Sequence, residues 1–417
     1  MANNTPSKKK IFNDPVYGFI LIPDNLHFKI IEHPFFQRLR RIKQLGLTHL
    51  VYPGALHTRF HHSLGAMHIM NQAVAILRSK GHLISNEEAQ AASLAILLHD
   101  IGHGPYSHTL EKTIVKNMTH EQMSLRIMKQ LNCQFEGKLD MAIRIFEGSY
   151  PHKFLCKLVS SQLDMDRIDY LKRDSFFTGV SEGTINADRL ITMLDIADDD
   201  LVIEAKGIYS VEKFLVARRL MYWQVYLHKT VLSAEYMLMN VLRRSKQLSM
   251  ADTDLPATPA LSYFLKNNPS SQDFENDILP LEMFVQLDDF DVFTALKLWQ
   301  NHTDKVLSFL SKSIVNRNLF KVEISDHPFP AGYIIEIKDK ICNKFSLNQH
   351  ECELLFIEEV TTNHAYHPLH SQINILYKDG STEDISVASD QLNVSVLSHP
   401  VVKYFICYPK SAVNLKD

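Results

Sequence analysis

His99 and Asp100 stand side by side at the end of an apolar run over residues 91–98. Such a pair offers a neutral imidazole and an anionic oxygen to one divalent cation. On a buried helix the carboxylate would be an unpaired charge in an apolar setting, which is costly. The pair alone is a weak signal, but nine of the 21 histidines fall between His57 and His120. Metal binding is therefore the first hypothesis for this region.

Two more residues can complete a ligand set. His62 precedes the pair in the chain and Asp166 follows it. Two imidazoles and two carboxylates suit Mn, Fe, Zn or Mg, and open positions would remain for water and a phosphate oxygen. For one histidine alone, an ordinary hydrogen-bonded or half-exposed side chain is the simpler interpretation, but for the whole set that requires several coincidences. We predict one divalent metal ion held by His62, His99, Asp100 and Asp166.

Groups for phosphate binding and proton transfer lie near these ligands. Arg59 precedes His62 by three residues, so both project from one helical face, and a guanidinium there can grip a phosphate in bidentate fashion. The alternative for Arg59 is a surface ion pair. His108 and Glu111 can pair on a helix, and a carboxylate behind an imidazole raises its basicity for acid–base work. His120 is followed by a glutamate, which also fits a helix start with an acidic first turn.

Helices must position these residues. Apolar residues recur at helical spacing from Phe28, and Pro53-Gly54 breaks the chain before a helix that begins near Arg59. A third helix follows the cap at Ser85 and runs to about Gly102. Further helices are predicted over 119–131, 139–147, 153–172, 211–248 and 292–311, with a small hairpin over 201–209 that turns at Lys206-Gly207.

The pattern changes near residue 317. Strands are predicted over 319–324, 353–360, 373–377, 383–387 and 402–408, with a turn at Asp379-Gly380. The expected fold is mainly α, with a helical core followed by a smaller C-terminal α+β region. The expected divisions are a mobile N-terminus at 1–10, the core at 11–315 and the α+β region at 316–417.

Composition limits the function classes. The net charge of −3 argues against broad nucleic-acid binding, and no stretch approaches the roughly 20 apolar residues of a membrane span. The N-terminus lacks the apolar core of a signal peptide. Five scattered cysteines without a C-x-x-C pair argue against a disulfide framework and fit a reducing compartment. We expect a soluble, cytoplasmic protein.

The ligand set matches the H…HD…D pattern of the HD-domain phosphohydrolases. Four longer blocks narrow the match, at residues 36–46, 51–60, 99–108 and 119–121. Over residues 10–235 the chain closely resembles the HD-domain deoxynucleoside triphosphate (dNTP) triphosphohydrolases, the dGTPase-like family that includes the human SAM-and-HD-domain enzyme and bacterial relatives. The resemblance implies an HD-domain helical core and hydrolysis of dNTPs to deoxynucleoside and triphosphate. Water would attack the α-phosphorus, with Mg on the nucleotide phosphates.

The resemblance also implies roles for individual residues. Phosphate contacts are implied for Arg59, His103, Arg167, Tyr170 and Arg218, and deoxyribose contacts for Gln44, Leu45, Asp174 and Tyr226. A tyrosine against the sugar would exclude the 2′-hydroxyl of ribonucleotides. The implied catalytic groups at the scissile phosphorus are His108 with Glu111, and His103 and His120 beside them. Some relatives have aspartate at position 111. Guanine is the expected base, although the sequence assigns no residue to recognition of the base.

Activation by a second nucleotide is a further implication. The segment 10–19 resembles the family's activator block, and Phe19 departs from it, so the block could instead be a packing strand. Activator contacts are implied for Lys10, Asn13, Glu32, Gln37, Arg38, Arg40, His228 and Lys229. In relatives such groups meet a nucleotide between subunits, so we expect a homo-oligomer, a dimer or a tetramer.

Two other functions stay open at this point. One is an HD hydrolase that acts on another phosphoester, such as a nucleoside monophosphate or a cyclic nucleotide. The other is a non-catalytic nucleotide sensor. The long blocks favour dNTP hydrolysis over the first, and the intact ligand set argues against the second. The sequence leaves open the metal used and the identity of any activator.

Overall fold

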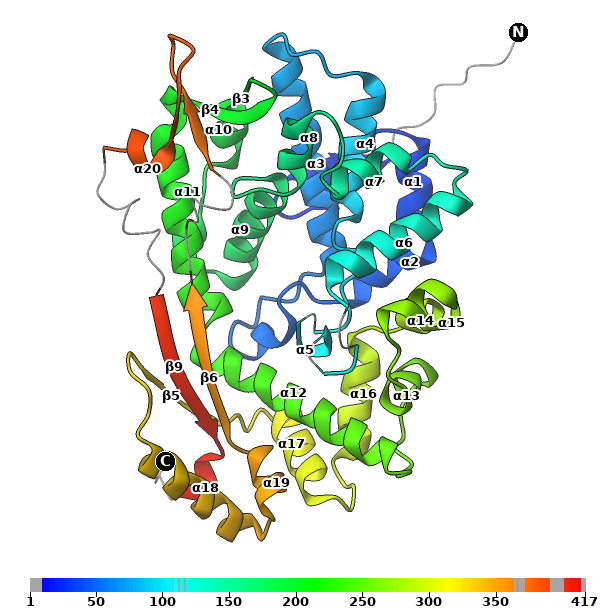
Figure 1. Cartoon of the computed structure of the whole chain (residues 1–417), viewed down its shortest axis with the longest axis vertical. Helices are drawn as coiled ribbons and strands as arrows, with labels where there is room; N and C mark the ends of the chain where they lie inside the picture. The colour runs from blue at the N-terminus through cyan, green and yellow to red at the C-terminus, as the bar shows by residue number, and fades with distance from the viewer. Residues whose placement is uncertain are drawn as a thin grey trace.

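The computed structural model describes residues 10–106, 108–111, 113–115, 118–363, 366, 372–390 and 401–413. Helices make up most of the described chain, and small sheets lie at its edges (Figure 1). The mainly α fold expected from the sequence is confirmed. Within the described residues, no helix combines the length and apolar character needed to cross a membrane.

Five helices carry or flank the metal ligands. They are α3 (Arg59–Ser79), α4 (Asn86–Leu98), α5 (His108–Glu111), α6 (His120–Gln134) and α9 (Met165–Thr178). The starts of α3 and α4 agree with the prediction because residues at each helix start determine where it begins. Ser85 caps α4 and accepts a hydrogen bond from the backbone N–H of Glu88, whose carboxylate accepts one from the Ser85 backbone N–H in return.

The other helices complete the body and its lower end in Figure 1. Their bounds are α1 (Asn25–Glu32), α2 (Pro34–Gln37), α7 (Asp140–Phe146), α8 (Lys153–Val159), α10 (Ala187–Thr192), α11 (Ile208–Met221), α12 (Lys229–Met250), α13 (Pro259–Lys266), α14 (Ser271–Asn276), α15 (Leu279–Phe284), α16 (Asp289–Trp299), α17 (Lys305–Val315), α18 (Ala331–Phe345), α19 (Gln349–Glu353) and α20 (Ile385–Ala388).

In the described part of the chain the strands form three sheets. The bounds are β1 (Ile11–Asp14), β2 (Gly18–Leu21), β3 (Leu194–Ala197), β4 (Asp200–Glu204), β5 (Lys321–Ser325), β6 (Ile357–Asn363), β7 (Asn374–Leu376), β8 (Thr382–Asp384) and β9 (Val401–Tyr408). β1 and β2 form an N-terminal hairpin. The other sheets have the orders β3-β4-β7-β8 and β5-β9-β6, and β4 pairs with β7 in parallel. The C-terminal region therefore returns to complete a sheet that the helical core begins.

Several predicted elements differ from the structure. The hairpin predicted to turn at Lys206-Gly207 is wrong, because β3 and β4 turn at Asp198 and Asp199, which both adopt positive φ, and α11 starts at Ile208. The single helix predicted over 211–248 is interrupted by a π-helical turn at Tyr222–Tyr226 before α12.

Three further predicted elements are divided or shorter in the structure. The helix predicted over 292–311 is two helices, because Asp304 caps α17 after a break. The strand predicted over 353–360 starts only at Ile357, after α19. The strand predicted over 383–387 ends at Asp384, whose side chain caps α20.

One disulfide bond is present, between Cys342 of α18 and Cys352 of α19. The spacing of the cysteines argued against a disulfide framework. Spacing along the chain does not show which cysteines the fold brings together, and it did not indicate this pair. Cys352 follows Cys342 by ten positions along the chain.

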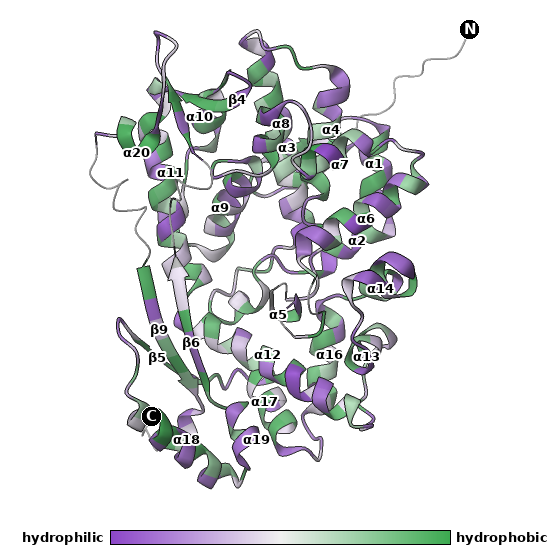
Figure 2. Ribbon diagram, in the orientation of Figure 1, coloured by the Kyte–Doolittle hydropathy of each residue, from purple (hydrophilic) through white to green (hydrophobic). Residues whose placement is uncertain are grey.

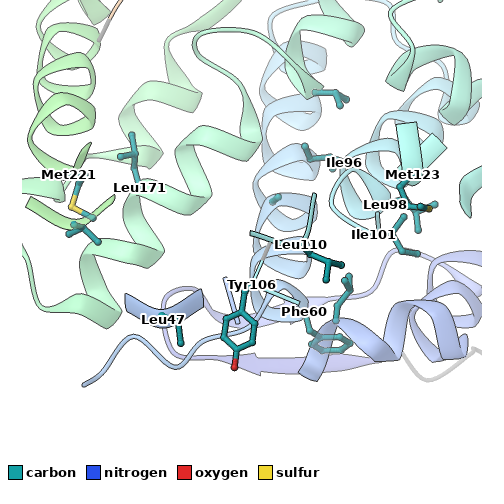
Figure 3. Close-up of a cluster of buried hydrophobic side chains, with 14 of the residues drawn as sticks. Leu47, Phe60, Ile96, Leu98, Ile101, Tyr106, Leu110, Met123, Leu171 and Met221 are labelled. Atoms are coloured by element: carbon teal, nitrogen blue, oxygen red, sulfur yellow. The ribbon is translucent and has the colours of Figure 1, made fainter. Parts of the chain in front are cut away.

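The apolar core lies directly beneath the site helices. Figure 3 shows a buried cluster that includes Phe60 of α3, Ile96 and Leu98 of α4, and Met123 of α6. Hydrophobic and hydrophilic residues alternate along most helices in Figure 2, as expected where one face of each helix is buried. This packing fixes the ends of α3 and α4, from which the predicted ligands project.

Candidate metal centre and substrate cavity

Three helix ends bring the predicted ligands together. His62 lies in the first turn of α3, His99 and Asp100 follow directly on α4, and Asp166 lies in the first turn of α9. The metal-binding arrangement predicted from spacing therefore has a simple structural cause, since each ligand sits where its helix meets the others.

The ligand atoms converge on one point. The Nε2 atoms of His62 and His99 are 3.2 Å apart, and Oδ1 of Asp166 lies 3.1 Å from the first and 3.4 Å from the second. Asp100 adjoins them, with Oδ1 3.3 Å from Nε2 of His99 and Oδ2 3.7 Å from Nε2 of His62. His62, His99 and Asp166 form a group whose ligand atoms could hold one metal ion.

The outer nitrogens of both imidazoles are already engaged. Nδ1 of His99 donates to the backbone oxygen of Ile96 at 2.6 Å, and Nδ1 of His62 donates to Asp169 at 2.7 Å. When both rings are neutral, each has a lone pair at Nε2, and the two lone pairs face each other beside a carboxylate. Only a cation between them makes this arrangement favourable, so the donor set fits a divalent metal ion.

The charges of this cluster shift its pKa values strongly. Burial lowers the pKa of His62, but the hydrogen bonds with Asp166 and Asp169 outweigh it and raise the pKa to about 10. Burial raises the pKa of Asp166, and its contacts with His62 and His99 reverse this and lower it well below its usual range. The carboxylates are thus held in the anionic form that a metal ion requires.

A chain of buried charges supports His62 from behind. Asp169 accepts a hydrogen bond from Nε of Arg173 at 2.9 Å, and Nη1 of Arg173 donates to Asp14 of β1 at 2.7 Å. Arg173 and Asp169 are fully buried. A Cβ atom at Gly65 would lie 2.1 Å from both side chains, so only glycine lets α3 pass this pair. The spacing of Asp169 and Arg173 four residues apart was the sequence signal for this pair, and we did not predict it.

A second group of titratable residues adjoins the metal ligands. Nε2 of His103 lies 3.3 Å from Asp100, Nδ1 of His120 lies 3.2 Å from Glu111, and the rings of His103 and His120 stack with centroids 4.0 Å apart. His103, Glu111 and His120 could also hold an ion by geometry. Of the predicted catalytic residues, only the side chain of His108 lies outside the described part, although its backbone opens α5.

The pKa values of the two stacked histidines shift in opposite directions. Burial and then the charge of Arg59 lower the pKa of His103 to about 3. Burial also lowers the pKa of His120, but the hydrogen bond and charge of Glu111, with the charge of Glu121, outweigh it and raise the pKa. Neighbouring groups with separated pKa values are typical of acid–base sites.

A cavity of about 500 Å³ opens beside these groups. Its lining includes four residues with predicted substrate contacts, namely Gln44, Leu45, Arg59 and Tyr226. Arg59 also forms an ion pair with Asp100 through Nη1, so the cavity and the metal ligands share a side chain. The remaining lining comes from α12, from residues 222–227, from the C-terminal strands β6 and β9, and from Gly46, Thr48, Tyr106 and Thr109.

Asp174 and His57 lie behind Tyr226. The hydroxyl of Tyr226 donates to Asp174 at 2.9 Å, and Nε2 of His57 lies 2.7 Å from the other carboxylate oxygen. Asp174 is buried and does not line the cavity. Its place in the fold orients the tyrosine ring, and His57 is a supporting residue that the sequence analysis did not single out.

The other predicted phosphate ligands gather around Tyr170. Its pKa is raised by burial and lowered in part by the charges of Arg218 and Arg167, with a net increase. Arg167 contacts Asp164 at 3.2 Å. Arg218 is buried, and its Nε and Nη1 atoms find no hydrogen-bond partner among the described residues. These three residues are absent from the lining of the cavity.

The residues with predicted activator contacts divide into two sets. Arg38 is fully buried and donates to the backbone oxygens of Leu287, Ile101 and His103, which gives it a structural role beside the His99–Asp100 loop. The others, which lie nearer the surface or at an element end, are Lys10, Asn13, Glu32, Gln37, Arg40, His228 and Lys229.

Arg40 and His228 are held in defined positions. Nε of Arg40 donates to Gln37 at 2.8 Å, and its guanidinium lies 3.6 Å from the ring centre of Phe60. His228 caps α12, with Nδ1 accepting from Thr230. Within the described residues, no hydrogen bond or ion pair joins His228 or Lys229 to the β1–β2 hairpin.

Comparisons with known proteins agree with this site. The HD domain model matches residues 59–174, and the HD associated region matches residues 185–256. The crystal structure of a phosphohydrolase from Bacteroides thetaiotaomicron superposes with a TM-score of 0.93 at 53% identity, covering 96% of this chain and 100% of that one. The uncharacterized protein YwfO of Bacillus subtilis is 36% identical over 339 residues, 79% of this chain and 76% of YwfO.

More distant relatives carry a more specific name. The deoxynucleoside triphosphate triphosphohydrolase SAMHD1 homolog of Dictyostelium discoideum is 30% identical over 257 residues, 57% of this chain and 50% of that protein. The resemblance seen in the sequence is thereby confirmed at the level of the family. The chain belongs to the HD-domain phosphohydrolases, among the relatives of the deoxynucleoside triphosphate triphosphohydrolases, and its chemistry is metal-dependent hydrolysis of a phosphoester.

Proposed function

We propose that this protein hydrolyses deoxynucleoside triphosphates to deoxynucleoside and inorganic triphosphate, with dGTP as the preferred substrate. The observation that carries the proposal is the cavity of about 500 Å³ that shares Arg59 with the metal ligands. A simple phosphoester needs only the metal centre, whereas this cavity has room for a sugar and a base beside it.

The triphosphate would be bound by cations that the fold already holds in place. Arg59 lies between Asp100 and the cavity, and a guanidinium can bind two phosphate oxygens at once. Arg218 is buried, two of its nitrogens lack partners among the described residues, and an unpaired buried guanidinium is costly. An anionic ligand supplies the missing acceptors, which supports a phosphate site here.

Proton transfer falls to the stacked histidines. Hydrolysis joins a water oxygen to the α-phosphorus and breaks the bond from that phosphorus to O5′, which must receive a proton. His120 would supply this proton, because its Nδ1 lies 3.2 Å from Glu111, whose carboxylate raises the pKa of the imidazole. The metal ion, held by His62, His99, Asp100 and Asp166, would polarise the phosphate and lower the pKa of the bound water.

The sugar subsite is built around Tyr226. The ring lines the cavity, and its hydroxyl is fixed by Asp174, which His57 holds in turn. A ring held in this way cannot swing aside for a bulkier sugar. Ribonucleotides are therefore poor substrates in this proposal.

The working enzyme is proposed to be a homo-oligomer that a second nucleotide tunes. Lys10, Arg40 and Lys229 are exposed cations with no role in the metal centre or the cavity. The β1–β2 hairpin also exposes a large apolar ring, Phe19, at 71% of its surface. A nucleotide bound between subunits would use these cations.

A product assay tests the proposed reaction. The full chain is incubated with Mn²⁺, Fe²⁺, Zn²⁺ or Mg²⁺ and each dNTP, singly and in pairs, and the products are separated by chromatography. We expect deoxynucleoside and triphosphate, and little turnover of ribonucleotides. Monophosphate with pyrophosphate would contradict cleavage of the bond between the α-phosphorus and O5′. Turnover of only a nucleoside monophosphate or a cyclic nucleotide would instead support another phosphoester substrate.

A further inference from the structure

The C-terminal sheet supplies part of the wall of the substrate cavity. Glu359 and Thr361 of β6 and Phe405 of β9 line the same cavity as Arg59, Gln44 and Tyr226. In Figure 1, β6 and β9 lie apart from α3 and α4, the helices that position His62 and the His99–Asp100 pair. A ligand bound in this cavity would therefore contact the C-terminal sheet as well as Arg59.

Exposure alternates along β6, and residues 359–362 all line the cavity. Glu358 and Val360 are exposed, whereas Glu359 and Thr361 are half-buried. Glu359 pairs with Phe405 across the sheet, and residues directly opposite each other project from the same face. The ring of Phe405 is 5.3 Å from that of Tyr236 on α12, which also lines the cavity. A carboxylate flanked by two aromatic rings thus faces the cavity.

The carboxylate of Glu359 has no hydrogen bond or ion pair within the described part of the chain. Glu235 of α12 also lines the cavity. The charges of Glu359 and Glu235 add to the effect of burial in raising the pKa of the Tyr236 hydroxyl, so all three lie close together. This wall repels a triphosphate, whereas Arg59 attracts it. A nucleotide in the cavity is therefore oriented with its phosphates at Arg59 and its base towards Glu359.

We infer that Glu359 selects the base of the substrate by accepting the two parallel N–H groups at N1 and N2 of guanine. The inference rests on the proposed function and deepens it. An ionised carboxylate only accepts hydrogen bonds and can accept two at once. Adenine presents one donor beside an acceptor at its pairing edge, and an acceptor facing Glu359 is unfavourable. Thymine and cytosine each present a single donor there.

The test compares three nucleotides and three proteins. The value of kcat/KM is measured for dGTP, for dITP, which lacks the N2 amino group, and for dATP. The proteins are the wild type, Glu359→Gln, and the matched control Glu358→Gln on the exposed face of the same strand. The wild type should prefer dGTP to dITP. Glu359→Gln should lower kcat/KM for dGTP by about 10- to 100-fold, since a hydrogen bond to a charged group is lost.

The same variant should raise the ratio of dATP to dGTP turnover, because a glutamine amide offers the donor and acceptor that adenine matches. Glu358→Gln should leave the ranking as in the wild type. An equal loss for all three nucleotides in Glu359→Gln would mean a structural role and would overturn the inference. So would a wild type that does not distinguish dGTP from dITP.

Failure of the proposed function is distinguishable from failure of this inference. If the wild type releases triphosphate from no dNTP, the proposed reaction is wrong. Calorimetric binding of dGTP, dITP and dATP then tests Glu359 alone. Tighter binding of dGTP that Glu359→Gln removes would still support base selection, and equal affinities would overturn it.

Discussion

Hydrogen bonds at Nδ1 decide what His62 and His99 do at Nε2. Asp169 and the Ile96 carbonyl take the outer protons, so both inner nitrogens present lone pairs to one point. The inner ligands could be predicted because the His99–Asp100 pair is a local feature of the sequence. Asp169 was not predicted, since its role depends on a tertiary contact with α3 that a spacing pattern does not show.

The paired replacement His99→Ala/Asp100→Ala should abolish both metal content and turnover. It removes two of the four ligands and leaves Arg59 without its carboxylate partner. Elemental analysis of the purified variant measures the metal directly, and circular dichroism checks that it folds. A folded variant that keeps one metal ion per chain would disprove this metal site.

Asp169→Asn should weaken metal binding by about 10- to 100-fold, the usual effect of losing a group that orients a metal-bound histidine. An asparagine still accepts from Arg173 but no longer raises the basicity of His62. Metal affinity is measured by competition with a chelator. Asp188→Asn, an exposed aspartate on α10, is the control and should bind metal as the wild type does. Equal metal affinities of Asp169→Asn and Asp188→Asn would show that Asp169 does not support the metal centre.

At the scale of helices and strands, the predictions were correct where neighbouring residues along the chain carry a capping or turn signal. α4 starts where Ser85 and Glu88 form a reciprocal cap, and such a signal is readable in the sequence. The β3–β4 turn uses two aspartates at positive φ in place of glycine, so it was missed. The break between α11 and α12 was missed too, because apolar periodicity continues through the π-helical turn.

The N-cap of α1 gives a prediction for stability and pH. Asp24 accepts from the backbone N–H groups of Leu26 and His27 and from the side chain of Gln90. Partial burial raises its pKa, but the hydrogen bonds from His27 and Gln90 outweigh this and lower it. Asp24→Ala should cost about 1 kcal/mol of unfolding free energy at pH 7, the usual value of a cap.

The pH dependence follows from the direction of that shift. A folded pKa below the unfolded value of about 3.9 gives stabilisation that is complete above this pH and is lost as the pH falls through the folded pKa. Denaturant titrations of wild type and Asp24→Ala from pH 7 downwards should therefore give a constant difference that shrinks only below about pH 4. A difference that grows on acidification would contradict the assignment.

At the scale of the whole molecule, the C-terminal region does not stand apart from the core. β7 pairs in parallel with β4, and β6 and β9 line the cavity beside Arg59. The predicted boundary near residue 316 marks a change of secondary structure, and contacts cross it in several places. Sequence patterns could indicate the strands but not these pairings, because a parallel partner more than a hundred residues away leaves no local signal.

The last prediction concerns assembly and regulation. Arg40 and Lys229 are exposed cations with no part in the described metal centre, and a ligand between subunits can shift an equilibrium only through different affinities for its two states. Arg40→Gln and Lys229→Gln should therefore weaken activation by a second dNTP and leave the metal content unchanged. Rates for dNTP mixtures and sedimentation velocity with and without nucleotide provide the measurements. If wild-type rates in mixtures equal the sum of the single rates, corrected for competition, and the protein sediments as a monomer throughout, the N-terminal hairpin serves packing alone.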